Sequence, residues 1–125
     1  DNARGLLAAV LLDQLGAAGS VIAGDLATSY LAFIAYAFNA DAGRFRNMLS
    51  YDGRWLEDYG SEDSHGRALW SLGAVLARST HQGWVSLANT LFVQAIPAAL
   101  TSAAPRAWAF ALLGIDEVQL RGKEI

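Results

Sequence analysis

Apolar residues recur at steps of three and four positions along almost the whole of this 125-residue chain, and this spacing constrains its fold more than any other feature. The spacing places apolar side chains on one face of an α-helix, because each helical turn takes 3.6 residues. No segment alternates apolar and polar residues over the length of a strand. The pattern predicts an all-α fold of antiparallel helical hairpins.

Glycine and proline mark where the expected helices begin and end. We expect helices over about residues 6–16, 25–39, 64–79, 84–100 and 105–114, the last with a weaker extension to residue 120. Gly16 and Gly19 close the first helix, and Pro105 stands at a favoured first-turn position of the fifth. These signals predict five helices.

The connections between these helices differ in length. Residues 16–24 and 80–83 form short connections, as is typical of antiparallel neighbours, whereas residues 40–63 form a long loop. In an up-down arrangement the first, third and fifth helices point the same way, so their N-termini share one end of the domain. The long polar loop lies there too, and we expect the chemistry of the protein at that end.

The composition is more apolar than a small monomer easily buries, with 54% hydrophobic and 17% charged residues. A partner subunit or further parts of the same fold would cover the excess. We therefore expect residues 1–125 to form a single domain that is either a homo-oligomer or part of a larger fold.

Charge, cysteine content and apolar runs narrow the function classes. A net charge of −3 and a pI near 5.2 argue against a nucleic-acid partner. The absence of cysteine excludes disulfides and cysteine-based zinc sites. The longest uninterrupted apolar run, residues 30–38, is far shorter than the roughly 18 residues that indicate a membrane span. We therefore expect no membrane partner and a cytoplasmic location.

Each of the three N-termini at the polar end carries an arginine in or near its first turn: Arg4, Arg67 and Arg106. This placement opposes the helix macrodipole, which favours acidic residues at N-termini. Residues that break a local rule without local benefit are candidates for function. We therefore expect these arginines to bind a ligand.

The long loop adds arginine, carboxylate, amide and aromatic side chains, namely Arg44, Arg46, Asn47, Tyr51, Asp52, Arg54, Trp55, Glu57, Asp58 and Tyr59. Arginine, carboxylate and amide groups each offer two polar atoms that can hydrogen-bond neighbouring sugar hydroxyl groups, and aromatic rings stack on the C–H faces of sugars. We expect an oligosaccharide or glycoside to be bound by Asn2, Arg4, Tyr51, Arg54, Trp55, His65, Arg67, Arg106 and Trp108. For each aromatic residue, a place in the core is the competing interpretation.

Several stretches together carry a family resemblance. They are Asp1-Asn2-Ala3-Arg4, Gly43-Arg44-Phe45-Arg46-Asn47, Ser50-Tyr51-Asp52 with Arg54-Trp55-Leu56-Glu57, Gly60-Ser61-Glu62-Asp63-Ser64-His65-Gly66-Arg67-Ala68-Leu69-Trp70, and residues 105–114. The chain resembles a bacterial family of six-hairpin glycosidase-like (α/α) barrels, often labelled glycosyltransferases or glycosidase-related proteins. The resemblance implies an (α/α)6 toroid that acts on carbohydrate. Five helices are too few for six hairpins, so the chain would be part of such a barrel.

Glycoside cleavage generally requires two carboxyl groups beside the scissile bond. Asp52, Glu62 and Asp63 are the candidates in the loop and at its end. Glu62 and Asp63 are adjacent and would point about 100° apart in a helix, so Asp52 paired with one of them is the better combination.

Non-catalytic roles remain open for these carboxylates. Glu62 and Asp63 would also stabilise the first turn of a helix capped by Ser61. Asp52 would equally form an ion pair with a nearby arginine, Arg54 or Arg67.

Glu62 and His65 form one Glu-x-x-His step, a spacing that di-iron bundles use in two copies together with further glutamates. With a single copy we expect neither a metal nor another cofactor, and His65 is interpreted as a hydrogen-bonding pocket residue.

Three functions are compatible with these features. The first is an enzyme that hydrolyses or transfers glycosyl groups, and the second is a non-catalytic module that binds glycan or protein beside a catalytic domain. The third is a helical interaction surface without any sugar, which predicts an exposed apolar groove instead of a polar mouth. A carboxylate pair with one raised pKa favours the enzyme, whereas carboxylates held by arginines favour the binding module.

Overall fold

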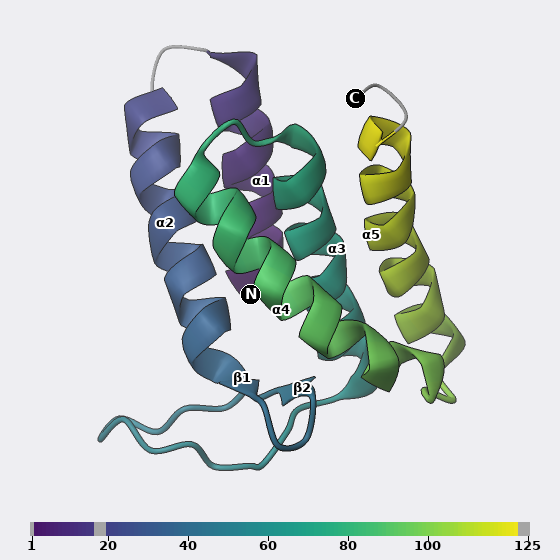
Figure 1. Ribbon diagram of the computed structural model, residues 1–125. Helices are drawn as coiled ribbons and strands as arrows, with labels where there is room; N and C mark the ends of the chain where they lie inside the picture. Colours follow the sequence, from purple (N-terminus) through teal and green to yellow (C-terminus); the bar gives the residue numbers. More distant parts are fainter. Residues whose placement is uncertain (1, 17–19, 123–125) are drawn as a thin grey trace.

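The computed structural model describes residues 2–16 and 20–122. Over these residues the chain forms five helices and one small sheet, in the order α1 (Asn2–Leu15), α2 (Ser20–Ala37), β1 (Phe38–Asn39), β2 (Arg44–Phe45), α3 (Glu62–Arg78), α4 (Gln82–Leu100) and α5 (Pro105–Gly122). Successive helices run in opposite directions (Figure 1). The all-α class that the apolar spacing predicts is confirmed.

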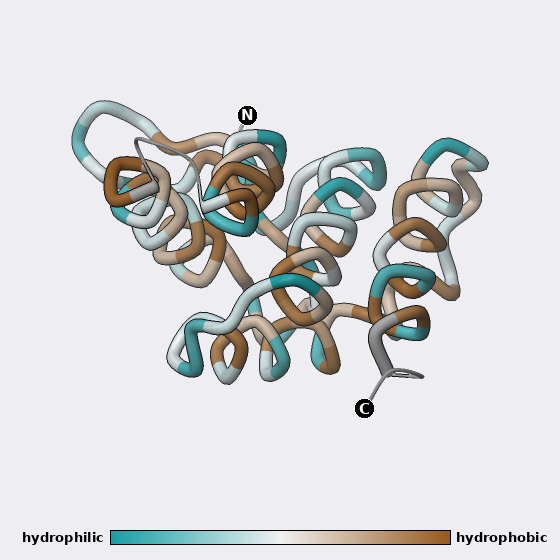
Figure 2. The backbone as a smooth tube through the Cα atoms, turned by 90° about the horizontal axis from the view of Figure 1, so that it is seen from above, coloured by the Kyte–Doolittle hydropathy of each residue, from teal (hydrophilic) through white to brown (hydrophobic). Residues whose placement is uncertain are grey.

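Helix α3 is the centre of the architecture. It lies between α1 and α5, which run parallel to it, and α4 crosses a third side of it, while α2 packs on α1 and touches α4 (Figures 1 and 2). The N-terminal ends of α1, α3 and α5 therefore point toward the same end of the molecule. The loop from β2 to α3 extends beyond the helices at this end.

Small residues allow α3 and α5 to approach closely. A Cβ atom on Gly66 would lie 2.7 Å from the carbonyl oxygen of Ala107, and one on Gly73 would overlap the backbone of Gly114. Gly66 and Gly73 are seven residues apart on α3, and their partners Ala107 and Gly114 are seven residues apart on α5. Seven residues make about two helical turns, so each helix presents both of its small residues on one face. A repeated small-residue contact therefore sets the spacing of these two parallel helices.

The main hydrophobic core lies between α1, α2, α3 and α4. Its largest fully buried apolar side chains come from α1 and α3, and buried leucine, isoleucine and alanine side chains of α2 and α4 pack against them. They include Leu6, Val10, Leu31, Ile34, Leu69, Leu72, Val75, Ala88, Leu91 and Ala95. Helix α5 adds only Ala111 to this cluster, so most of its apolar side chains lie outside the core.

The second helix begins earlier in the chain than the sequence predicted. Helix α2 begins at Ser20 rather than near residue 25, so Val21 and Gly24 are helical. Nothing between these residues breaks a helix, and an isolated glycine costs only about 1 kcal/mol there. Gly16 ends α1 as predicted, with a φ of 62°, whereas Gly19 lies outside the described residues.

A short antiparallel hairpin also differs from the expectation of no strands. β1 pairs with β2 through Phe38 opposite Phe45 and Asn39 opposite Arg44. Gly43 adopts a φ of 66° in the turn between them. Two-residue strands are too short to produce an alternating pattern, which explains why the sequence did not predict them.

Among the described residues, α4 is the one helix whose length and apolar content would allow it to cross a membrane, with a mean hydropathy of 1.3 over 18 residues. Polar residues interrupt its apolar runs, so the search for uninterrupted runs did not identify it. Core helices of proteins also meet this criterion, and here Ala88, Leu91 and Ala95 of α4 are buried against the rest of the fold.

Candidate functional site

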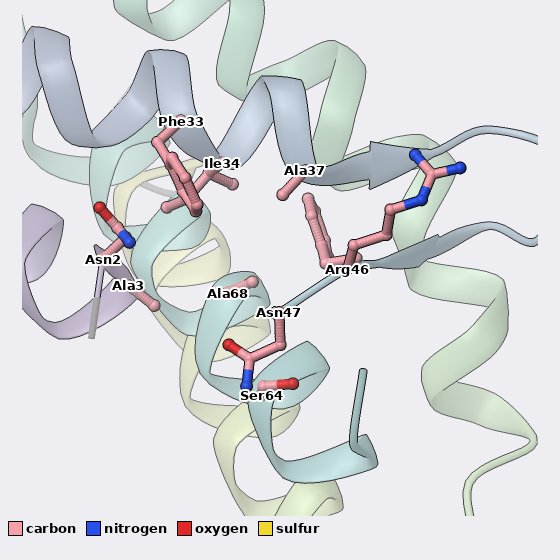
Figure 3. Close-up of a pocket in the computed structure, with 10 residues that line it drawn as sticks. Asn2, Ala3, Phe33, Ile34, Ala37, Arg46, Asn47, Ser64 and Ala68 are labelled. Atoms are coloured by element: carbon pink, nitrogen blue, oxygen red, sulfur yellow. The ribbon is translucent and has the colours of Figure 1, made fainter. Parts of the chain in front are cut away.

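The polar end of the molecule is formed by the N-termini of α1 and α3, the C-terminal part of α2 and the loop of residues 46–61. A notch of about 40 Å³ opens there, lined by Asn2, Ala3, Phe33, Ile34, Ala37, Phe45, Arg46, Asn47, Ser64 and Ala68 (Figure 3). The amide of Asn47 is directed toward the α3 side of the notch, whereas the guanidinium of Arg46 is directed away from it. This volume suits one or two water molecules, and ligand pockets for rings are several times larger.

The loop itself is held by its own polar groups. The Glu57 carboxylate accepts hydrogen bonds from the backbone N–H groups of Asn47 and Met48, the second at 2.8 Å. The Asn39 side chain donates to the Asp58 carbonyl at 2.9 Å. Arg44 donates to the Gly60 carbonyl at 2.7 Å. Glu57 is therefore a structural residue that fixes the two sides of the loop.

An aromatic cluster forms the outer wall of the polar end. The ring of Trp55 lies 5.9 Å from that of Phe33 and 5.3 Å from that of Tyr36. The Arg46 guanidinium lies 5.9 Å from the Trp55 ring, and Arg44 stacks over Tyr59 at 4.7 Å. Helix α2 thus supplies the support on which the loop tryptophan rests. Tyr36 and Tyr59 are exposed on this wall, whereas both arginines and the Trp55 ring are partly buried.

Asp52 lies in an exposed turn at residues 50–54, closed by a hydrogen bond from the Ser50 N–H to the Arg54 carbonyl at 2.9 Å. Its carboxylate accepts from the Ser50 hydroxyl and from Arg54 Nε, the latter at 3.0 Å. The Ser50 hydroxyl is the main cause that lowers the pKa of Asp52, and Arg54 adds to the effect. Asp52 is therefore an ionised partner of Arg54, as one of the two alternatives predicted.

Glu62 and Asp63 occupy the first turn of α3, below the N-cap Ser61, whose side chain accepts from the Ser64 N–H at 3.1 Å. Acidic residues at this position stabilise a helix through its dipole. Asp63 also forms an ion pair with Arg106 at 3.3 Å, which links α3 to α5. Asp52 and Asp63 are thus each ion-paired with an arginine, and the pairing of Asp52 with Glu62 or Asp63 across a scissile bond stays a prediction.

His65 is buried, with 3% of its surface exposed. Its Nε2 lies 2.9 Å from the Ala95 carbonyl, so Nε2 carries the proton and donates it to α4. Burial is the main cause that lowers the pKa of His65, and the nearby Arg44 guanidinium lowers it further. The imidazole is therefore neutral at pH 7. It joins α3 to α4 beside a small cavity of about 10 Å³ that Arg44 and Glu62 also line.

The remaining predicted binding residues do not converge. Tyr51 is fully exposed in the loop turn, and Arg4 is exposed on α1. Arg67 lies over the ring of Phe110 at 5.9 Å. Trp108 donates to the Ser102 carbonyl at 2.6 Å and lines a groove between α4 and α5, away from the polar notch. Of the predicted residues, Asn2 alone lines the notch.

Several residues of the polar end were not predicted as site residues. Arg46 and Asn47 lie in the loop, where composition alone did not distinguish them from their neighbours, and Phe33 and Ser64 were read as helix residues. The Gly43-Arg44-Phe45-Arg46-Asn47 stretch was a signal for the first two, because it forms β2 and leads directly into the notch.

The described residues contain no group of three or more His, Cys, Asp or Glu side chains able to hold a metal ion. Comparison of the chain with protein-family models, with curated proteins and with solved structures finds no match.

Proposed function

We propose that this chain is a non-catalytic helical-hairpin module that binds carbohydrate at its polar end. In this proposal its carboxylates hold the loop and the helix ends, and they do not cleave a glycosidic bond. The exposed aromatic and arginine side chains of the loop and of α2 form the binding surface.

The observation that carries the proposal is the state of the loop carboxylates. Asp52 is held by Ser50 and Arg54, Glu57 by two backbone N–H groups, and Asp63 by Arg106. A general acid for glycoside cleavage needs a raised pKa, whereas the pKa of Asp52 is lowered. These contacts favour the binding module over the enzyme.

Shallow recognition of a sugar also agrees with the shape of the polar end. The notch of about 40 Å³ is too small to enclose a sugar ring, so a ring would lie across the surface and stack on an aromatic face. Tyr36, Tyr51 and Tyr59 are each more than half exposed there. Arg46 and Arg54 supply guanidinium donors for hydroxyl or carboxylate groups of the sugar.

The arrangement of the helices supports the fold that the family resemblance implies, an (α/α) toroid. Parallel helices α1, α3 and α5 with antiparallel partners α2 and α4 are what a section of an (α/α) toroid would contain. In this proposal the chain is one such section, and the carbohydrate surface lies at the end that carries the N-termini of the parallel helices.

Isothermal titration of neutral and acidic oligosaccharides into the chain tests this proposal. We expect binding at millimolar ligand that Tyr51→Ala and Arg46→Gln weaken, whereas Leu15→Ala, at the opposite end, leaves it unchanged. We also expect Asp52→Asn and Glu62→Gln to retain binding. The proposal fails if no oligosaccharide binds, or if the wild-type chain releases sugar from its ligand.

A further inference from the structure

A pocket lies at the end of the molecule opposite the polar end, where α1 ends and α2 and α4 begin (Figure 1). It is open to solvent and has a volume of about 440 Å³, whereas the notch at the polar end has about 40 Å³. Its polar and aromatic lining consists of Asp13, Asp25, Thr28, His81 and Trp84. Ligand pockets typically measure about 300–1,000 Å³, so this one is large enough for a small organic molecule.

Contacts between helices hold the side chains of this pocket in place. Trp84 Nε1 donates to the Thr28 hydroxyl at 3.0 Å, and that hydroxyl donates to the Gly24 carbonyl at 3.0 Å. His81 Nε2 lies 3.2 Å from Asp13 Oδ2, and the His81 and Trp84 ring centroids are 3.9 Å apart. These contacts join α1, α2 and α4. The lining is therefore arranged before a ligand arrives, which lowers the entropic cost of binding.

The charge of the pocket is negative. Asp13 and Asp25 supply two carboxylates, and no lysine or arginine among the described residues lines the pocket. Arg78, at the adjacent end of α3, is paired with a glutamate of α5. The helix ends contribute partial charges of about +0.5 each from α2 and α4 and about −0.5 from α1, and a protonated His81 would offset one carboxylate but not both. The pocket therefore favours a cation.

Asp25 is the carboxylate that is free to bind a ligand. It is exposed on the second turn of α2, and within the described part of the chain its carboxylate has no hydrogen-bond or ion-pair partner. Asp13 uses one oxygen, Oδ2, in its contact with His81. A primary ammonium group carries three N–H donors, so it has enough donors for both carboxylates.

We propose that this pocket binds a small primary amine in its protonated form, with an apolar body attached to the ammonium group. The ammonium donates hydrogen bonds to the carboxylates, which is the stronger class of hydrogen bond because both partners are charged. The apolar body lies against Trp84 and Val21, whose side chains line the same pocket. The indole ring also attracts the cation directly. This site is separate from the carbohydrate surface, because the two lie at opposite ends of the helices.

The indole N–H signals of the four tryptophans test this proposal by nuclear magnetic resonance of the intact chain. Among them Trp84 alone lines the pocket, and Trp84→Phe identifies its signal. We expect 2-phenylethylammonium chloride at millimolar concentration to shift the Trp84 signal until it saturates. The signals of Trp55, Trp70 and Trp108 should stay in place.

2-Phenylethanol is the matched control ligand, because it has the same carbon skeleton without the charge. At the same concentration and ionic strength it should not produce the Trp84 shift. An equal shift with 2-phenylethanol, or no saturable Trp84 shift with the amine, would overturn the proposal.

Asp25→Asn tests the role of the charge, because it removes one carboxylate and keeps the size of the side chain. We expect the dissociation constant of 2-phenylethylammonium to rise about three- to tenfold. Asp116→Asn is the matched control variant, since Asp116 is exposed on α5 and does not line the pocket, and it should leave the constant unchanged. Equal dissociation constants for the two variants contradict the proposed site.

Discussion

Gly73 of α3 faces Gly114 of α5 so closely that a Cβ atom on Gly73 would overlap the Gly114 carbonyl group. Both partners at this contact are backbone atoms, so no flexible side chain can move aside for an added methyl group. The contact joins two parallel helices whose sequences are about 40 residues apart. It explains why α5 packs tightly on α3 while contributing little to the main core.

We predict that Gly73→Ala forces α3 and α5 apart and lowers the free energy of unfolding by about 2 kcal/mol or more. Gly83→Ala is the matched control, because a Cβ atom on Gly83 meets nothing within 4 Å. That substitution is expected to be neutral or to stabilise the chain by up to about 1 kcal/mol. Urea unfolding at one fixed protein concentration measures both values. Equal stability of the two variants would show that the close contact is not a constraint.

We predict that His65 makes the stability of the chain depend on pH. Burial lowers its pKa below the ordinary value of 6.5, so the folded state binds the proton less readily than the unfolded state. Its contribution is present in full above pH 6.5 and is lost as the pH falls below that value. Unfolding curves across this range should show stability rising with pH.

His81 provides the control for this pH dependence, because it is exposed and pairs with Asp13 at 3.2 Å at the other end of the bundle. His65→Leu should remove most of the slope near pH 6, while His81→Asn should keep it. An unchanged slope in His65→Leu would assign the pH dependence to other groups.

We predict that the ion pair between Arg78 and Glu117 stabilises the packing of the C-terminal half of α5 against the end of α3. Arg78 Nε and Nη2 donate to the two carboxylate oxygens of Glu117 at 2.9 and 2.8 Å, and Glu117 raises the pKa of Arg78. Both side chains are partly buried, so Glu117→Gln should lower the free energy of unfolding by about 1 kcal/mol. Asp25→Asn, at an exposed position of α2, should change it by less than about 0.5 kcal/mol.

A double-mutant cycle with Arg78→Met isolates the pairwise energy of this ion pair. If the effects of Arg78→Met and Glu117→Gln simply add, the two residues do not stabilise each other and the prediction is wrong.

The sequence predicted the features that depend on local signals. Pro105 starts α5 and Gly16 ends α1 because proline favours a first turn and glycine tolerates a positive φ. The meeting of three N-termini at one end followed from the loop lengths and the up-down order. The pairing of Asp52 with Arg54 was also accessible, since the two residues lie two positions apart.

Features that depend on distant contacts could not be predicted in this way. Arg106 was interpreted as a binding residue because it opposes the helix dipole, yet its partner Asp63 lies 43 positions away. The same limit applies to Trp108, whose place in the α4–α5 groove depends on how two helices cross. Trp55 was predicted to bind sugar, but nothing local indicated that Phe33 and Tyr36 would support it.

Nuclear magnetic resonance of the isotope-labelled chain during titration with an oligosaccharide tests the central claim most directly. The account predicts shifts of the amide signals of residues 46–57 and of Ser64, with no new anomeric sugar signal during prolonged incubation. Shifts confined to the α4–α5 groove, the absence of any shift at millimolar ligand, or the release of a new reducing end would contradict it.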